Sequence, residues 1–155
     1  MAQAGSMKIL SLWEPWASFV ARGYKKWETR SWPTSYRGPL AIHAAKTAEE
    51  IWSYRLKLSE AGIIENLDAP DDFPKEDRDW PLGCIVAVCV VTDCRPTAEV
   101  QPSRMEKALG DYTPGRFAWI LENVRAVKPL PHRGMQGLKN LPAEVQSKLE
   151  FLQAA

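Results

Sequence analysis

The sequence predicts an α+β fold in which the strands curl into a small β-barrel flanked by helices. Its 155 residues, 45% hydrophobic and 25% charged, suffice for one hydrophobic core. Segments with strand-like patterns outnumber helical ones, and they do not alternate with helices as the regular βαβ units of a doubly wound sheet would. We therefore expect a single domain over residues 7–155, preceded by an expression leader over residues 1–6.

The first half of the chain predicts three strands and two helices. Apolar alternation favours strands over residues 8–13, 26–32 and 38–45. A helix is expected to begin after Pro15 and to end at Gly23. The capping-box pattern that opens at Thr47 predicts a second helix, running towards Gly62.

Strands dominate the second half, after an acidic loop. Residues 65–81 are rich in proline and acidic side chains, which favours a surface loop without core residues. Residues 84–91 are apolar at every position, as in a strand buried on both faces. The remaining expectations are a short helix over 99–109, a half-buried strand over 116–124, a loop over 129–137 and a last helix opening at Pro142.

Charge is distributed unevenly although its total is +1. Residues 8–46 carry seven Lys or Arg against two Glu, residues 47–82 carry four against ten acidic side chains, and residues 83–155 carry nine against seven. A polyanion-binding protein with a basic face fits this pattern, and so does a well-solvated surface with no partner.

Several classes of protein are excluded by what the sequence lacks. No apolar run approaches the ~18 residues that a membrane-spanning helix needs. Cys84, Cys89 and Cys94 lie five residues apart, a spacing that fits neither zinc sites nor redox pairs. We therefore expect a cytoplasmic protein with reduced cysteines and no metal or other cofactor.

Residues 13–38 are the most informative segment, because they hold four of the seven tryptophans. Lys25, Arg30 and Arg37 are interleaved with these aromatic residues. Cations that attract phosphates and flat rings on which bases stack are the two components of a nucleic-acid site. Tryptophans also fill cores. We assign Trp16 and Trp27 to the core and leave Trp13 and Trp32 open between core and site.

The pattern G-x-K-x-x-E-x-R places a carboxylate between two cations, Lys25, Glu28 and Arg30. On a strand, Glu28 and Arg30 share one face. The carboxylate is either a buried, charge-paired orienting group or a proton-transfer group, unless all three side chains are solvated at the surface. We predict that Glu28 is buried and paired with Lys25 or Arg30, because an unpaired buried carboxylate is costly.

Five spaced motifs resemble the ASCH domain family, whose members have a PUA-like β-barrel. They are P-W-A-S, then G-x-K-x-x-E-x-R with S-W-x-T-x-x-R-G, then G-R-F-A-W-I-L-E-N and R-G-M-Q-G-L, and together they span Ser11 to about Leu141. The resemblance implies a cleft between the barrel and the first helix, lined by Lys25, Glu28 and Arg30, and a role in binding RNA.

The preferred hypothesis is a cleft that holds a nucleotide or a short single-stranded RNA or other nucleic acid. Lys25 and Arg30 would contact phosphate or base edges, and Glu28 would accept hydrogen bonds. The full set of candidate nucleic-acid contacts is Lys25, Glu28, Arg30, Trp32, Arg37, Arg116 and Arg133.

Two other classes of function stay open. Some relatives deacylate N4-acetylcytidine with the motif lysine and a threonine three positions later, and others cleave RNA. Here Glu28 replaces that threonine, so Lys25 and Glu28 would be the catalytic residues of a metal-independent hydrolase, an amidohydrolase or a ribonuclease. Alternatively, exposed tryptophans would bind a protein partner.

A second departure from the family is Glu14, where relatives often have glutamine. We expect it to place a negative charge near the path of the phosphates.

Overall fold

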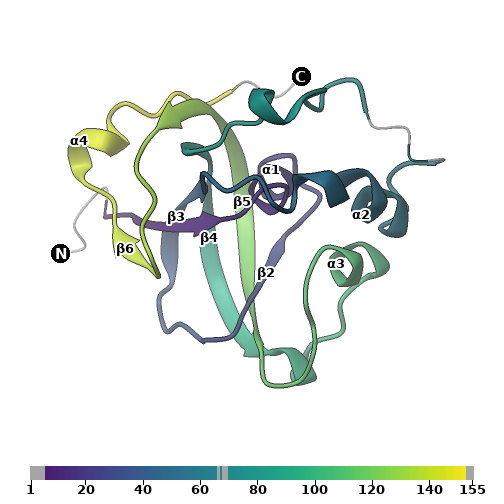
Figure 1. The fold of residues 1–155 in the computed structure, drawn as a ribbon. Coiled ribbons are helices and arrows are strands. Elements are labelled where there is room, and N and C mark those ends of the chain that lie inside the picture. Colours follow the sequence, from purple (N-terminus) through teal and green to yellow (C-terminus); the bar gives the residue numbers. More distant parts are fainter. Residues whose placement is uncertain (1–5, 66, 68–69, 153–155) are drawn as a thin grey trace.

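The computed structural model describes residues 6–65, 67 and 70–152, and residues 1–5 of the expected leader lie outside this range. Its centre is a six-stranded sheet in the order β2-β5-β4-β3-β1-β6 (Figure 1). The strands in that order are Trp27–Arg30, Phe117–Pro131, Cys84–Pro96, Gly38–Ala44, Lys8–Leu12 and Lys139–Asn140. β1 and β3 are parallel, and the other neighbours are antiparallel. The sheet confirms the α+β class.

The sheet curls like an opened barrel whose edges are β2 and β6 (Figure 1). The long pair β4 and β5 shifts register at three places along its length. Such irregularities increase strand twist and bending, so they help the sheet to curl. They also explain why both strands run further than predicted, since each shift interrupts the period of two on which the prediction rests.

Four short helices flank the sheet. They are α1 (Trp16–Ala21), α2 (Tyr54–Glu60), α3 (Arg104–Ala108) and α4 (Ala143–Gln146). α1 contacts β3, β4 and β5, while α2 and α3 contact each other. Single 3-10 turns lie at Ile51–Ser53, Asp77–Asp79 and Thr97–Glu99. In the part of the chain that the structure describes, no helix has the length and apolarity needed to cross a membrane.

Two helix predictions were wrong in extent. α2 begins at Tyr54, after a 3-10 turn, and has no side-chain cap at its start. The predicted capping box is therefore absent from the start of α2, and Glu50 lines a cleft beside Trp16. The last helix ends at Gln146, and Phe151 then pairs with Val127 as an extended bridge.

The core has three clusters of buried side chains. The largest fills the curve of the sheet around Leu10, Ile42 and Trp119. A second cluster lies under α2 and contains Phe73 and Trp80, both at most 4% exposed. The expectation that residues 65–81 supply no core was therefore wrong: Phe73 stacks on Tyr54, and Trp80 packs edge-on against it. The third cluster, around Ile9, Ile85 and Val127, lies towards the C-terminal segment.

The three cysteines are free thiols, as expected. Cys89 lies in the main core, and its burial raises its pKa to about 12. A thiol with so high a pKa is almost entirely protonated at neutral pH, so Cys89 acts as a small core residue.

Candidate functional site

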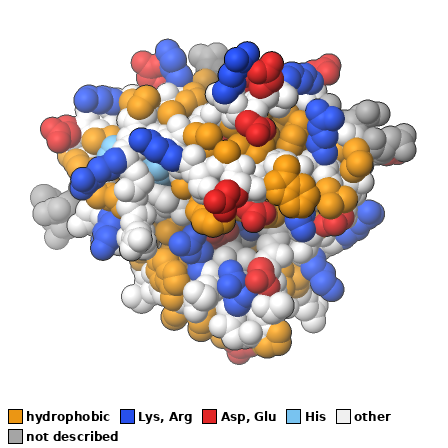
Figure 2. Space-filling view, in the orientation of Figure 1, with side chains coloured by type: hydrophobic (Ala, Val, Ile, Leu, Met, Phe, Trp, Pro, Cys, Tyr) orange, Lys and Arg blue, Asp and Glu red, His pale blue; other side chains and the backbone are white. Residues whose placement is uncertain are grey.

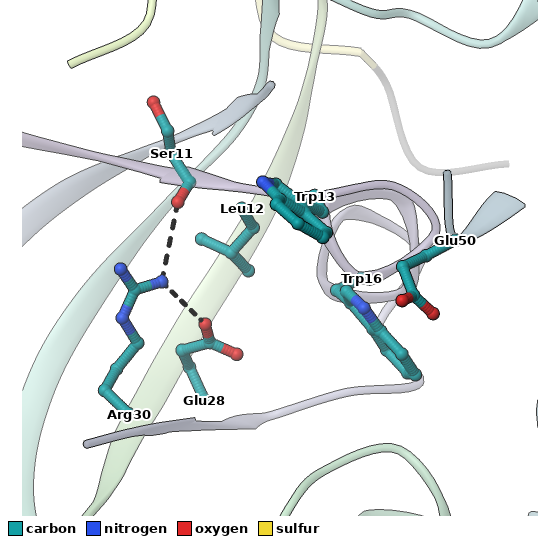
Figure 3. Close-up of a pocket in the computed structure, with 7 residues that line it drawn as sticks. All are labelled: Ser11, Leu12, Trp13, Trp16, Glu28, Arg30 and Glu50. Atoms are coloured by element: carbon teal, nitrogen blue, oxygen red, sulfur yellow. Dashed lines mark hydrogen bonds and ion pairs between the residues drawn. The ribbon is translucent and has the colours of Figure 1, made fainter. Parts of the chain in front are cut away.

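A cleft lies between α1 and β2, and it consists of three adjoining cavities. The central cavity, about 370 Å³, is shown in Figure 3 and is lined by Ser11, Leu12, Trp13, Trp16, Glu28, Arg30 and Glu50. One neighbour, about 340 Å³, shares Trp16, Glu28 and Glu50 with it and extends to Lys25, Asp111 and Arg116. The other, about 540 Å³, shares Ser11, Trp13 and Arg30 and extends to Lys46 and residues 134–137.

Glu28 lies at the floor of the cleft between two cations. Its Oε1 is 3.4 Å from the Lys25 ammonium, and its Oε2 is 3.2 Å from Nη1 of Arg30. The residue is 7% exposed. The predicted burial and pairing of Glu28 are therefore confirmed. Two cations compensate the loss of hydration that makes a buried carboxylate costly.

Lys25 precedes β2 and is 1% exposed. Its Nζ donates hydrogen bonds of 2.7 Å to the backbone carbonyls of both Trp27 and Leu109. Oε1 of Glu28 lies 3.4 Å from the same nitrogen as an ion-pair partner. The side chain thus joins the start of β2 to Leu109, the residue after α3, and its buried ammonium contacts acceptors of the protein itself.

Arg30 is the more available cation, with a side chain 23% exposed. Both of its hydrogen bonds use Nη1, one to Glu28 and a long one of 3.5 Å to the carbonyl of Ser11. Nε and Nη2 have no hydrogen-bond partner among the described residues. The guanidinium also lies 5.4 Å from the centre of the Trp32 ring. Arg30 can therefore bind a ligand without breaking its contact with Glu28.

Two tryptophans form the wall opposite Glu28 and Arg30 (Figure 3). Trp13, in the segment between β1 and α1, is 48% exposed. Trp16, at the start of α1, is half-buried and packs edge-on against Phe19. Trp16 was predicted to be a core residue, and this is only half correct, because its packed edge leaves the rest of the ring in the cleft wall.

Glu14 lies elsewhere than expected. It is completely buried, and its two carboxylate oxygens accept hydrogen bonds from the backbone N–H and the hydroxyl of Ser18, at 2.7 and 2.5 Å. Burial raises its pKa, which the hydrogen bonds from Ser18 partly offset. The side chain fixes the first turn of α1 and does not line the cleft.

The other candidate contacts fall into two groups. Arg116 lines the cleft beyond Glu28, where it donates to the carbonyls of Thr29 and Asp111. Trp32, Arg37 and Arg133 do not line the three cavities. Trp32 packs edge-on against Trp119, with ring centres 4.9 Å apart. Arg37 pairs with Asp93 at 3.5 Å.

The threonine beside Glu28 is already engaged. The hydroxyl of Thr29 accepts a hydrogen bond of 3.0 Å from the N–H of Asp111. It therefore supports the loop after α3, and no contact joins it to Lys25. Among the described residues, no group of three or more His, Cys, Asp or Glu side chains could hold a metal ion.

Sequence reasoning missed several residues of the cleft: Ser11, Lys46, Glu50 and the loop 134–137. A loop was predicted over residues 129–137, but no spacing in the sequence relates it to Lys46 or Arg30. The fold brings these segments together through the parallel pairing of β1 with β3 and the return of the chain after β5.

Comparisons with known proteins identify the family of the chain. Residues 10–131 match the model of the ASCH domain family. The chain is 31% identical over 144 residues to mouse activating signal cointegrator 1, covering 88% of this chain and 22% of that protein. It is 36% identical over 87 residues to the human protein of the same name, covering 55% of this chain and 14% of that one. The chain therefore spans about a fifth or less of these relatives.

Solved structures show the same fold at low identity. The ASCH protein from Zymomonas mobilis superposes with a TM-score of 0.52 at 14% identity, over 92% of each chain. A point mutant of that bacterial protein superposes with a TM-score of 0.53 at 12% identity, over 92% of this chain and 95% of that one. With the family match over most of the sequence, these comparisons establish that the chain belongs to the ASCH domain family.

Proposed function

We propose that the cleft binds single-stranded RNA or a nucleotide. The observation that carries this proposal is the arrangement of the central cavity, where a charge-paired carboxylate faces two partly exposed tryptophan rings (Figure 3). Unstacked bases bind to proteins by stacking on aromatic rings and by hydrogen bonds along their edges. The cleft offers both kinds of contact within one cavity.

Glu28 suits a base edge that carries N–H groups. Each carboxylate oxygen can accept two hydrogen bonds, and in this cleft each oxygen faces one cation. Acceptor capacity therefore remains for an exocyclic amino group, such as that of cytosine or adenine, or for the N–H edge of guanine. Lys25 and Arg30 hold the carboxylate in place, and Arg30 retains free donors for the ligand.

Binding is favoured over hydrolysis by the engagement of the groups that would perform catalysis. Lys25 Nζ donates to two backbone carbonyls and pairs with Glu28, so it is held by contacts within the protein. The Thr29 hydroxyl is held by Asp111. A hydrolase that used Lys25 for proton transfer would first have to break one of these contacts.

The test is a titration of fluorescently labelled single-stranded RNA with the protein at several salt concentrations. We expect affinity to fall with salt, with a slope of about 0.7 per neutralised phosphate. Trp13→Ala should weaken binding by about 1–3 kcal/mol through lost stacking. Trp52→Ala is the matched control, because Trp52 is 76% exposed but does not line the cleft.

Three results would contradict the proposal. They are no measurable RNA affinity, affinity independent of salt, and equal loss in the two tryptophan variants. In parallel, the protein is incubated with N4-acetylcytidine. Turnover that Lys25→Ala and Glu28→Gln both abolish would show that the site is a hydrolase instead.

A further inference from the structure

The cleft continues past Arg30 into the cavity of about 540 Å³, and the charges there differ from those around Glu28. Arg30 and Lys46 are its charged lining residues, and no carboxylate lines it. Lys46 is exposed and has no ion-pair partner among the described residues. In Figure 2, Lys and Arg side chains (blue) lie next to the histidine atoms (pale blue) at the left of the view. The cavity therefore carries uncompensated positive charge.

The loop 134–137 lines the same cavity. The N–H of Met135 donates to the hydroxyl oxygen of Ser11 at 3.3 Å. The N–H groups of Gly134, Gln136 and Gly137 have no acceptor among the described residues. Backbone N–H groups next to cations are a common way for proteins to bind phosphate.

A chain of hydrogen bonds fixes the position of this loop. Nε2 of His43 lies 2.6 Å from the carbonyl oxygen of His132, and Nδ1 lies 2.9 Å from the hydroxyl of Ser11. Because a carbonyl only accepts, Nε2 of the neutral ring carries the proton and Nδ1 accepts from Ser11. His43 is completely buried, so the chain Met135, Ser11, His43 and His132 ties both ends of the turn to β1 and β3.

Gly134 allows the loop to lie directly over this chain. A Cβ atom at that position would lie 3.3 Å from Cε1 of His43 and 3.5 Å from Oγ of Ser11. The first distance is shorter than an ordinary carbon contact, so a side chain at this position would require the loop or the His43 ring to shift by a few tenths of an ångström.

From these observations we infer that the cavity is a phosphate subsite. It would take the phosphate of a nucleotide whose base occupies the Glu28 part of the cleft, so the preferred small ligand is a nucleoside monophosphate. The inference rests on the proposed function, and it adds a direction: the base lies towards Glu28 and the phosphate towards Lys46. Figure 3 shows the Ser11 carbonyl pointing towards Arg30, while the Ser11 hydroxyl points away from Arg30 and Glu28.

The test compares ligands with and without phosphate by calorimetry. The probes are the four nucleoside 5′-monophosphates, their nucleosides and inorganic phosphate. We expect the best monophosphate to bind at least about tenfold more tightly than its nucleoside, because it adds charge-assisted hydrogen bonds. Lys46→Met should reduce this ratio to below about threefold, while Lys107→Met, which changes an exposed lysine outside the cleft, should leave it unchanged.

The outcomes separate this inference from the proposed function. If nucleoside and monophosphate bind equally, or if Lys46→Met leaves the ratio unchanged, the phosphate subsite is wrong, even where RNA binds. If RNA, nucleosides and nucleotides all fail to bind, both proposals are wrong. The affinities of RNA with and without a 5′-phosphate show which phosphate occupies the subsite. Tighter binding of the phosphorylated strand supports a terminal phosphate, and equal binding supports an internal phosphodiester.

Discussion

The two ends of the cleft use the same types of residue for different purposes. At the Glu28 end, formed by Lys25, Glu28 and Arg116, every cation has an acceptor from the protein. The Lys46 end is formed by Lys46 and the loop 134–137. Among the described residues, Lys46 has no acceptor, and neither do three backbone N–H groups of the loop. A lysine that is 1% exposed holds the fold together, whereas an exposed lysine beside a cavity remains available for a ligand. Burial and partners therefore distinguish the two roles, and residue type does not.

The largest effect expected from this comparison is on stability at the Glu28 end. Glu28→Leu removes the carboxylate and leaves the buried ammonium of Lys25 uncompensated, which should lower the free energy of unfolding by about 3–5 kcal/mol. Glu50→Leu is the matched control, since Glu50 lines the same cavity without an ion pair among the described residues. Urea unfolding measures both, and equal losses would refute the structural role of Glu28.

The two lysines should separate stability from binding. Lys25→Met leaves two backbone carbonyls without their donor and should cost about 1–3 kcal/mol of stability. Lys46→Met should change stability by less than about 0.5 kcal/mol. The salt dependence of RNA binding should show the reverse, with a slope lowered by about 0.7 in the Lys46 variant only. A lowered salt-dependence slope in the folded Lys25 variant would place a phosphate contact at the Glu28 end, and this would contradict the phosphate subsite at Lys46.

A smaller effect is expected from crowding the Lys46 end without changing its charge. Gly134→Ala places a methyl group against His43 and should displace the loop. We expect a loss of about threefold to tenfold in affinity for the nucleoside monophosphates, with little change for the nucleosides, because only charge-assisted contacts to the phosphate lengthen. Calorimetry on this variant checks the result, and unchanged monophosphate affinity would remove the loop from the subsite.

The smallest effect is a dependence of stability on pH through His43. Burial, with added repulsion from His132 and Lys46, lowers the pKa of His43 below the ordinary value of 6.5. The unfolded chain therefore binds more protons than the folded one below about pH 6.5, so this contribution to stability is present above that pH and is lost as the pH falls. His43→Gln should show a shallower decline between pH 7 and pH 5 in thermal unfolding. A decline equal to that of the unmodified protein would exclude His43 as its source.

Much of the Glu28 end could be predicted from sequence, because its residues are close together in the chain. Glu28 and Arg30 are two residues apart on a strand, which puts them on one face, and Lys25 lies just before the strand. The ion pairs then follow from the cost of burying a lone carboxylate. The role of Lys25 was harder to predict, since its acceptor at Leu109 is 84 residues away.

The Lys46 end could not be predicted in this way. Its residues come from β1, β2, the segment after β3 and the loop 134–137, which only the sheet order brings together. Composition was also misleading for Phe73 and Trp80, because their segment is acidic and rich in proline although both rings are buried. Acidic neighbours face solvent there while the aromatic rings cover α2.

The most direct test of the account is a crystal structure with the nucleoside monophosphate that binds best. We predict its base between Trp13 or Trp16 and Glu28, and its phosphate within hydrogen-bond distance of Lys46, Arg30 or the N–H groups of the loop 134–137. A phosphate beside Arg116, with the base towards Lys46, would contradict the direction of binding. A nucleotide bound outside the cleft, for example at Arg37, would contradict the proposed function itself.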